Sequence, residues 1–327
     1  MTPQDEQFVQ RAIVGLADPP PTVVLVTDKS SADDPMAHFC DRLVELAPNI
    51  KIRREDDGPF PAPALVMGRH LNIGYQVNPT GKMLEGMVDA LNSASSGVCD
   101  PPPSHEDLAK RIDLPVTLKL YVAQGCPHCP GSLSRLQALA AHNPFIRLRV
   151  IDGEAFALQA RADQVRSVPT LILDDQVRWS GPVNMEEVLT FCIDRDPSSL
   201  SAASLRQLIE AGDAARVSSM MRESGRLFPA LTDLLTHERW SVRLGAMVTA
   251  EYLAEDAPAL GLELCERLWR KFHTLPPQVQ GDVLQVWGQI ESKTTRGYLL
   301  SVISGDCDEE TKATAAEVLD EMGANGD

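Results

Sequence analysis

The 327-residue sequence lacks a long apolar run and any excess of positive charge. No stretch approaches the ~20 consecutive apolar residues of a membrane-spanning helix, so we expect no membrane segment. The 30 Lys and Arg residues are outnumbered by 46 Asp and Glu, which gives a formal net charge of -16. Neither half of the chain is basic, and this argues against nucleic acids and anionic membranes as partners.

The first residues also lack the features of a secretion signal. The segment after Met1 is acidic and polar, with neither a basic region nor an apolar stretch. We therefore expect the protein in the cytoplasm. Its seven cysteines are an odd number and are widely scattered, which does not describe a disulfide scaffold.

Only one pair of cysteines is closely spaced, in the segment Cys126-Pro127-His128-Cys129. The segment follows a predicted strand and opens a predicted helix, so both sulfurs fall on one helix face, one turn apart. Free backbone N–H groups and the helix dipole stabilise a thiolate on Cys126. Pro127 suits the first helical position, and a protonated His128 adds a nearby positive charge.

These features assign different roles to the two sulfurs. We expect Cys126 to be the attacking thiolate, with a pKa below the ordinary thiol value of about 8.5. Cys129 lies further into the helix and is expected to resolve the mixed disulfide. A Cys-x-x-Cys is also half of a zinc site or part of an iron–sulfur site shared between two chains. No second pair of cysteines or histidines has ligand spacing, so we expect no metal and no bound cofactor.

A second signature is Val168-Pro169-Thr170, which opens a predicted strand 40 positions after Cys129. In the thioredoxin fold a cis-proline faces the dithiol, and the residue before it offers backbone groups to a substrate chain. We expect Pro169 and Val168 to have these places. The other titratable residues form no constellation, and Asp152, at a strand end, is interpreted as a cap.

The chain repeats one order of elements. Residues 1–92 and 113–196 both read as a strand, a helix, a strand, a hairpin and a closing helix, which indicates a duplicated β-α-β…β-β-α unit. A linker and a connecting helix are expected at 93–112. The first copy has Ser30 and Asp33 where the second has its cysteines, and Pro63 in place of Pro169. It is therefore expected to be a structural half.

From residue 200 onward the pattern changes to consecutive helices. Three predicted helical pairs follow one another at a spacing near that of HEAT repeats. The segments 240–247 and 309–316, with Arg243 and Lys312, resemble inner helices of such repeats. The alternative is a plain helical bundle. The sequence thus predicts an α/β protein of two tandem thioredoxin-like folds, followed by an all-α HEAT-like domain at 200–327.

With the duplication and the single dithiol in place, residues 1–196 resemble a known family. It is the N-terminal domain of the flavoprotein subunit of alkyl hydroperoxide reductase, close to glutaredoxin-like protein disulfide oxidoreductases. In that family the domain passes electrons from a flavin dithiol to a peroxiredoxin, and an acidic residue of the silent half approaches the dithiol. The resemblance extends over residues 125–130, Asn143-Pro144, residues 151–156, Val168-Pro169-Thr170, Pro63 and Pro79-Thr80-Gly81.

The chain departs from that family in two ways. Met83 takes the acidic position, with Glu85 close by, and no Gly-x-Gly-x-x-Gly fingerprint for flavin or nicotinamide binding follows. The resemblance implies a peroxiredoxin as a candidate partner, with any flavin step supplied by a separate flavoprotein reductase.

Two functions of different classes are open at this point. The first is a thiol–disulfide oxidoreductase that exchanges disulfides with protein partners through Cys126 and Cys129, while the helical domain binds those partners. The second is a non-catalytic adaptor that uses both units as binding platforms. Intact Cys126, Cys129 and Pro169 favour the enzyme, because a platform does not need all three.

Overall fold

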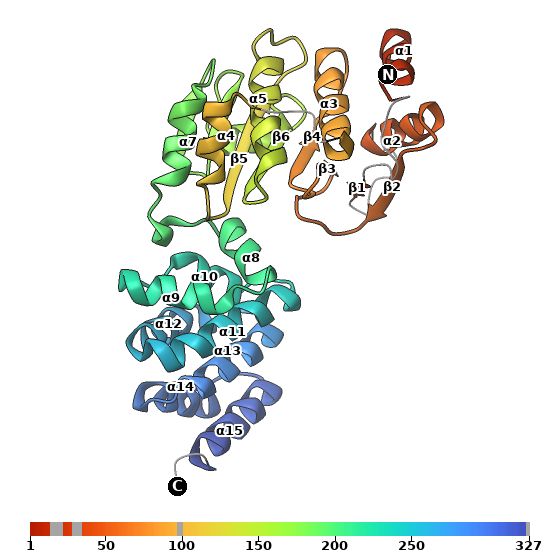
Figure 1. Ribbon diagram of the computed structural model, residues 1–327. Coiled ribbons are helices and arrows are strands. Elements are labelled where there is room, and N and C mark those ends of the chain that lie inside the picture. Colours follow the sequence, from red (N-terminus) through yellow and green to blue (C-terminus); the bar gives the residue numbers. More distant parts are fainter. Residues whose placement is uncertain (14–21, 28–34, 97–100, 325–327) are drawn as a thin grey trace. The chain divides into compact units, whose positions relative to one another are not determined.

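The computed structural model describes residues 1–13, 22–27, 35–96 and 101–324 (Figure 1). The chain divides into two compact units, Met1–Arg195 and Asp196–Asp327. Ser30 and Asp33, which the duplication aligns with the two cysteines, lie outside the described residues, as does Cys99.

The first unit contains an eight-stranded sheet with the order β2-β1-β3-β4-β6-β5-β7-β8. In its first half, β1 is parallel to β2 and antiparallel to β3, and β3 is antiparallel to β4. In the second half, β5 pairs in the same ways with β6 and β7, and β7 with β8. The predicted duplication is confirmed. The strands are β1 (Thr22–Val26), β2 (Lys51–Glu55), β3 (Ala64–Met67), β4 (Ile73–Gln76), β5 (Val116–Val122), β6 (Ile146–Asp152), β7 (Thr170–Leu173) and β8 (Val177–Ser180).

The two halves share this sheet through β4 and β6, which are parallel, with Ile73 opposite Leu148 and Gln76 opposite Ile151. Asn72 strengthens the junction, since its Nδ2 donates to the carbonyls of Ala140 (2.7 Å) and Ile146 (2.8 Å). The tandem folds are therefore not separate bodies joined by a linker, because backbone hydrogen bonds run from one half into the other.

Seven helices are described in this unit, and most of them cover one face of the sheet, so that one apolar core extends through both halves (Figure 1). Alternate strand residues, such as Leu118 and Leu120 of β5, point into that core, as expected for a sheet with one face packed on helices. The helices are α1 (Pro3–Ala12), α2 (Pro35–Leu46), α3 (Lys82–Ser96), α4 (Pro103–Lys110), α5 (Cys129–His142), α6 (Ala157–Ala162) and α7 (Met185–Ile193).

Caps and packing set the ends of three helices. α1 begins at Pro3, because Thr2 caps it by accepting the Asp5 N–H. α3 continues to Ser96, into the expected linker. α4 contacts α5 and α7, and Ala109 at its end is fully buried in the core. Much of the segment 93–112 is therefore a structured part of the first unit.

The second unit consists of a 3₁₀ turn (Pro197–Ser199) and eight helices, as far as the chain is described. Consecutive helices pack as pairs, and α9, α11, α13 and α15 contact one another in series, as do α8, α10, α12 and α14. This arrangement is consistent with helical repeats; their assignment to the HEAT class stays a prediction. The helices are α8 (Ala202–Glu210), α9 (Ala214–Ser224), α10 (Pro229–Leu235), α11 (Trp240–Asp256), α12 (Pro258–Phe272), α13 (Pro277–Gln289), α14 (Lys293–Ser304) and α15 (Glu309–Ala324).

Arg243, which the sequence placed on an inner helix, links neighbouring pairs of this unit. Its side chain is buried on α11; Nε donates to Asp282 of α13 at 2.5 Å, and Nη1 donates to the carbonyl of His237 at 2.8 Å. Lys312 on α15 differs, because it pairs with Glu309 of its own helix, whose side chain is exposed.

Candidate active site at the Cys126–Cys129 disulfide

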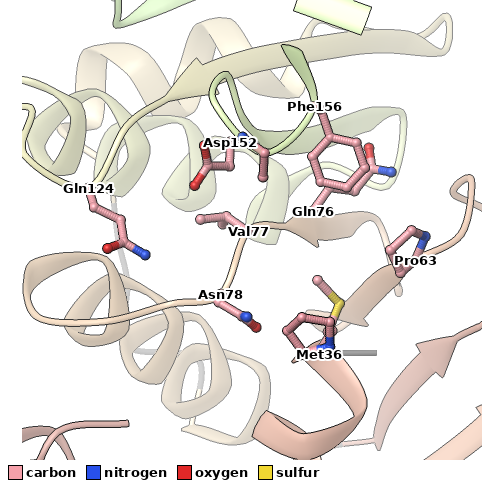
Figure 2. A pocket seen from close by; sticks show the side chains of 10 residues that line it. Met36, Pro63, Gln76, Val77, Asn78, Gln124, Asp152 and Phe156 are labelled. Atoms are coloured by element: carbon pink, nitrogen blue, oxygen red, sulfur yellow. Dashed lines mark hydrogen bonds between the residues drawn. The ribbon is translucent and has the colours of Figure 1, made fainter. Parts of the chain in front are cut away.

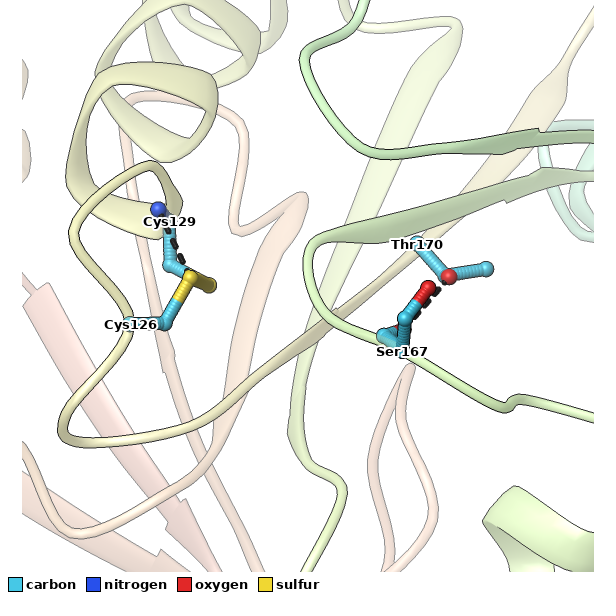
Figure 3. Close-up of a disulfide and its surroundings, with 4 residues drawn as sticks. All are labelled: Cys126, Cys129, Ser167 and Thr170. Carbon is cyan, nitrogen blue, oxygen red and sulfur yellow. Dashed lines mark hydrogen bonds between the residues drawn. A yellow bond between two sulfur atoms is a disulfide. The ribbon is translucent and has the colours of Figure 1, made fainter.

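Cys126 and Cys129 form a disulfide at the start of α5 (Figure 3). The buried strand β5 ends at Val122, and a short loop carries the chain to Cys126. Cys126 is partly exposed, whereas Cys129 is fully buried in the main core. A partner sulfur can therefore reach Cys126 but not Cys129.

The start of α5 differs by a few residues from the predicted one. The helix begins at Cys129 with His128 as its N-cap, and Pro130 occupies the first turn. Pro127 thus precedes the helix and is not its first residue. Pro130, not Pro127, is the proline in the first turn, where a missing N–H is tolerated. The Cys129 N–H is one of the donors left free by the helix start, and it points to Cys126 Sγ at 3.1 Å.

The loop before β7 contains the second signature. The Val168–Pro169 peptide bond is cis, as is Ala62–Pro63 at the matching position of the first half. Thr170 Oγ1 donates to the Ser167 carbonyl at 2.7 Å and holds this bend (Figure 3). Val168 and Cys126 both pack against the core cluster that contains Cys129. Within the described chain the backbone N–H and carbonyl of Val168 have no hydrogen-bond partner.

Met83, which the resemblance places at the acidic position of the silent half, is buried. Gly86 of α3 packs on α5, since a Cβ there would lie 3.3 Å from Leu133 Cδ2. α3 follows β4 and α5 follows β5, and these two strands run in the same direction. On α3, Met83 lies about one turn before Gly86. On α5, Cys129 lies about one turn before Leu133. Met83 is 3% exposed within the core that contains Cys129, whereas Glu85 is exposed. Where the resemblance implies an acid, this chain therefore has a buried apolar side chain.

Three of the remaining described cysteines are poor nucleophiles because their pKa is raised. Cys40, Cys192 and Cys265 are buried, and burial raises the pKa of both Cys192 and Cys265 to about 12. Burial and Asp308 also raise the pKa of Cys307. Cys192, Cys265 and Cys307 therefore stay protonated near neutral pH.

A pocket beside the dithiol loop contains residues that sequence reasoning missed. Its volume is about 290 Å³, and it lies at the carboxyl ends of β4 and β6 (Figure 2). We call it the Asp152 pocket. Asp152 also caps the turn after β6, as interpreted from the sequence, because Oδ1 accepts the N–H groups of Glu154 (2.9 Å) and Ala155 (3.0 Å). The lining residues are Pro35, Met36, Pro63, Gln76, Val77, Asn78, Gln124, Asp152, Ala155 and Phe156.

One signal in the sequence pointed to this place. Polar residues that end neighbouring parallel strands meet at one sheet edge, where ligands of α/β proteins bind. Asn78 and Asp152 have that position, but the sequence did not show that β4 and β6 are neighbours.

The described residues offer neither a metal cluster nor a membrane-spanning helix. No group of three or more His, Cys, Asp and Glu side chains in them could hold a metal ion. None of the helices in the described part of the chain combines the length and the apolar character needed to cross a membrane.

Comparison with known proteins places this geometry in context. Residues 116–193 match the family described as thioredoxin domain. The F subunit of alkyl hydroperoxide reductase in Xanthomonas campestris pv. phaseoli is 24% identical over 192 residues, which cover 57% of this chain and 36% of that protein. A protein named NADH dehydrogenase from Bacillus subtilis is 25% identical over 166 residues, 50% of this chain and 32% of that protein. The chain thus spans about a third of the length of these relatives.

Two solved structures share the fold. The N-terminal domain of the alkyl hydroperoxide reductase AhpF of Enterococcus faecalis has a TM-score of 0.50 at 18% identity, covering 58% of this chain and 98% of that one. A protein disulfide oxidoreductase from Aeropyrum pernix also has a TM-score of 0.50, at 15% identity, with coverage of 59% and 92%. The first unit therefore contains a thioredoxin-like domain and resembles the N-terminal domain of AhpF and a protein disulfide oxidoreductase.

Proposed function

We propose that the chain is a protein thiol–disulfide oxidoreductase that acts through Cys126 and Cys129. The observation that carries this proposal is the asymmetry of the pair: one sulfur is accessible and receives a backbone N–H, and the other is buried at the first residue of the helix. Disulfide exchange needs an accessible attacking thiolate and a second thiol that reacts only within the complex.

The exchange proceeds in two steps that conserve electrons. The Cys126 thiolate attacks one sulfur of a substrate disulfide, and the other substrate sulfur leaves as a thiolate. Cys129 then loses its proton and attacks Cys126 Sγ, which releases the second substrate thiolate. The chain ends with the Cys126–Cys129 disulfide, and the substrate has gained two electrons; the reverse sequence oxidises a dithiol substrate.

The neighbouring residues have supporting roles in this proposal. His128, at the N-cap of α5, supplies positive charge when it is protonated, and Pro127 shapes the approach to the helix. The backbone groups of Val168, which have no partner in the described part of the chain, hydrogen-bond an extended substrate chain, and Pro169 fixes their orientation.

The relatives suggest partners for this exchange. Part of the F subunit of alkyl hydroperoxide reductase is similar in sequence to 192 residues of this chain. We therefore propose a peroxiredoxin as a substrate and a separate flavoprotein reductase as an electron source. A separate reductase fits the absence of a Gly-x-Gly-x-x-Gly fingerprint in the sequence, and we propose no resident cofactor. We also propose a cytoplasmic location.

We further propose that the helical unit binds the redox partner. α11 exposes Trp240, Leu244, Val248 and Tyr252, which are 59%, 42%, 37% and 38% exposed. Their spacing of four residues aligns them along one face of the helix, and contiguous exposed apolar surface is typical of protein-binding sites.

Reduction of insulin disulfides by the full chain tests the proposed activity. We expect turnover with a dithiol reductant, and loss of it in Cys126→Ser. An unreactive wild-type chain would favour the adaptor instead. In Cys129→Ser the mixed disulfide stalls, so the partner is identified by mass spectrometry. Adding Trp240→Ala and Leu244→Ala should lower the trapped amount of that partner without changing insulin reduction by the otherwise intact chain.

A further inference from the structure

The Asp152 pocket has a polar end and an apolar end. In Figure 2, Gln124 and Asp152 lie toward one side, Phe156, Pro63 and Met36 lie toward the other, and Asn78 lies between them. Its volume of about 290 Å³ suits one side chain or a small ligand rather than a folded segment.

The polar end offers hydrogen-bond acceptors that the protein itself does not use. Asn78 Oδ1 is buried and has no partner among the described residues. Asp152 uses Oδ1 to cap a turn, while Oδ2 has no partner in the described chain. A buried acceptor without a donor is costly, so this end is complementary to a ligand that brings N–H donors.

The two ends together select a cation on an alkyl stem. The Asp152 carboxylate attracts positive charge, and the side-chain oxygens of Asn78 and Gln124 accept hydrogen bonds from the same group. An ammonium group has three N–H donors, one for each of the three acceptor side chains, Asp152, Asn78 and Gln124. Phe156 and Met36 provide apolar surface for a methylene chain. A lysine side chain fits such a surface, because its stem is apolar and only its terminal ammonium group is polar.

The location connects the pocket with the dithiol. Gln124 precedes Cys126 by two residues in the loop after β5, a span of at most about 7 Å of chain. A substrate polypeptide with its sulfur at Cys126 can therefore insert a side chain a few residues away into the pocket. We propose that the Asp152 pocket binds a lysine side chain of the substrate, which makes a lysine near the reactive cysteine a determinant of substrate choice. This inference rests on the proposed function for its biological meaning, but its binding step does not depend on redox activity.

The kinetic test uses symmetric disulfide dimers of short peptides with one cysteine. In separate peptides, one lysine is placed at each position from four residues before to four residues after the cysteine. Matched peptides have norleucine, arginine or glutamate in place of that lysine. The reduced full chain attacks either equivalent sulfur, and quenched-flow chromatography measures peptide thiol. At the best position we expect lysine to react about tenfold faster than norleucine, the factor of one charge-assisted hydrogen bond.

Matched variants assign that ratio to the pocket. Asp152→Asn keeps the capping oxygen and removes the charge, so the lysine-to-norleucine ratio should fall to about twofold or less. Glu154→Gln removes an equal charge from an exposed neighbour outside the pocket and should keep the ratio. Gln124→Ala, on an exposed loop residue, should lower it partially and serves if Asp152→Asn does not fold. A ratio near one at every position overturns the proposal, as does an equal loss in Glu154→Gln.

Binding without chemistry separates this inference from the proposed function. The same peptides with serine in place of cysteine are titrated into the oxidised chain by calorimetry. Lysine peptides should bind about tenfold more tightly than norleucine peptides, and Asp152→Asn should abolish the difference. Equal binding of arginine peptides would overturn the assignment to lysine. If lysine binding is observed but no peptide or insulin disulfide is reduced, the proposed function fails and the pocket assignment stands.

Discussion

The backbone N–H of Cys129 points to Cys126 Sγ across 3.1 Å. The donor lies at the N-terminus of α5, where N–H groups have no intrahelical acceptor. It therefore remains available after reduction, and a thiolate accepts a stronger hydrogen bond than a thiol does.

The first prediction concerns the alkylation of Cys126. In the Cys129→Ser variant, its alkylation rate should reach half its maximum well below the ordinary thiol pKa of about 8.5. The helix N-terminus and the His128 side chain both favour the thiolate. His128→Ala should move the midpoint to higher pH. A midpoint at or above 8.5 with His128 intact, measured by iodoacetamide labelling and mass spectrometry, would contradict this explanation.

The buried cysteines should behave in the opposite way. Because burial raises the pKa of Cys192 and Cys265 to about 12, neither should be labelled at pH 8 in the folded, reduced chain. Their pKa is higher when folded than when unfolded, so this contribution to stability is complete below about pH 8.5 and is lost as the pH rises toward 12. Cys192→Ala should reduce the slope of unfolding free energy against pH in that range. An unchanged slope, or labelling at the rate of Cys126, would show that these sites open.

Asn72 should be important for joining the two halves. Asn72→Ala removes the donor of three hydrogen bonds, to the backbone carbonyls of Ala140, Asn143 and Ile146. We expect the free energy of unfolding of the first unit to fall by about 1–3 kcal/mol. Asn49→Ala, at an exposed turn, is the control and should change it by less than about 0.5 kcal/mol. Urea unfolding of both variants checks the difference; equal values would mean that the junction adds little.

The silent half should matter for stability more than for chemistry. Residues 113–196 alone would expose the edge of β6 that pairs with β4, and also the face of α5 that packs on α3. We expect this fragment to melt at a lower temperature than residues 1–196, or to aggregate through the open edge. Its redox potential, measured in glutathione buffers, should stay within about 30 mV, or 1.4 kcal/mol. A larger shift at equal melting temperature would show that the first half tunes the dithiol.

The first unit should fold and act without the helical unit. Arg195, at its end, pairs with Asp174 and donates to the Pro115 carbonyl at 2.6 Å, so a fragment of residues 1–195 retains its own terminal anchor. We expect it to be soluble and to reduce insulin at a rate similar to that of the full chain, while turnover with the natural partner falls. An insoluble fragment would mean that the helical unit is needed to complete the core.

Local sequence was sufficient for the element types and the dithiol. Periodicity predicted the order of strands and helices in both halves, and the spacing of Cys126 and Cys129 indicated the start of a helix. The turn between β7 and β8 also fits its local sequence, since Asp174 and Asp175 both have positive φ, a conformation that Asp tolerates in tight hairpins. Helix ends were less certain, since the capping side chain of Thr2 and the packing of Ala109 decided them.

The sequence by itself therefore determined the duplication, the closely spaced cysteine pair, the Val168–Pro169 signature and the change to a helical array, because each depends on neighbours in the chain. The tertiary structure alone decided that the two copies share one sheet. Edge pairing between β4 and β6 is a contact between distant segments, and residue periodicity does not specify which edges meet. The Asp152 pocket follows from that pairing, because only the junction of β4 and β6 brings Asn78 and Asp152 to the same edge.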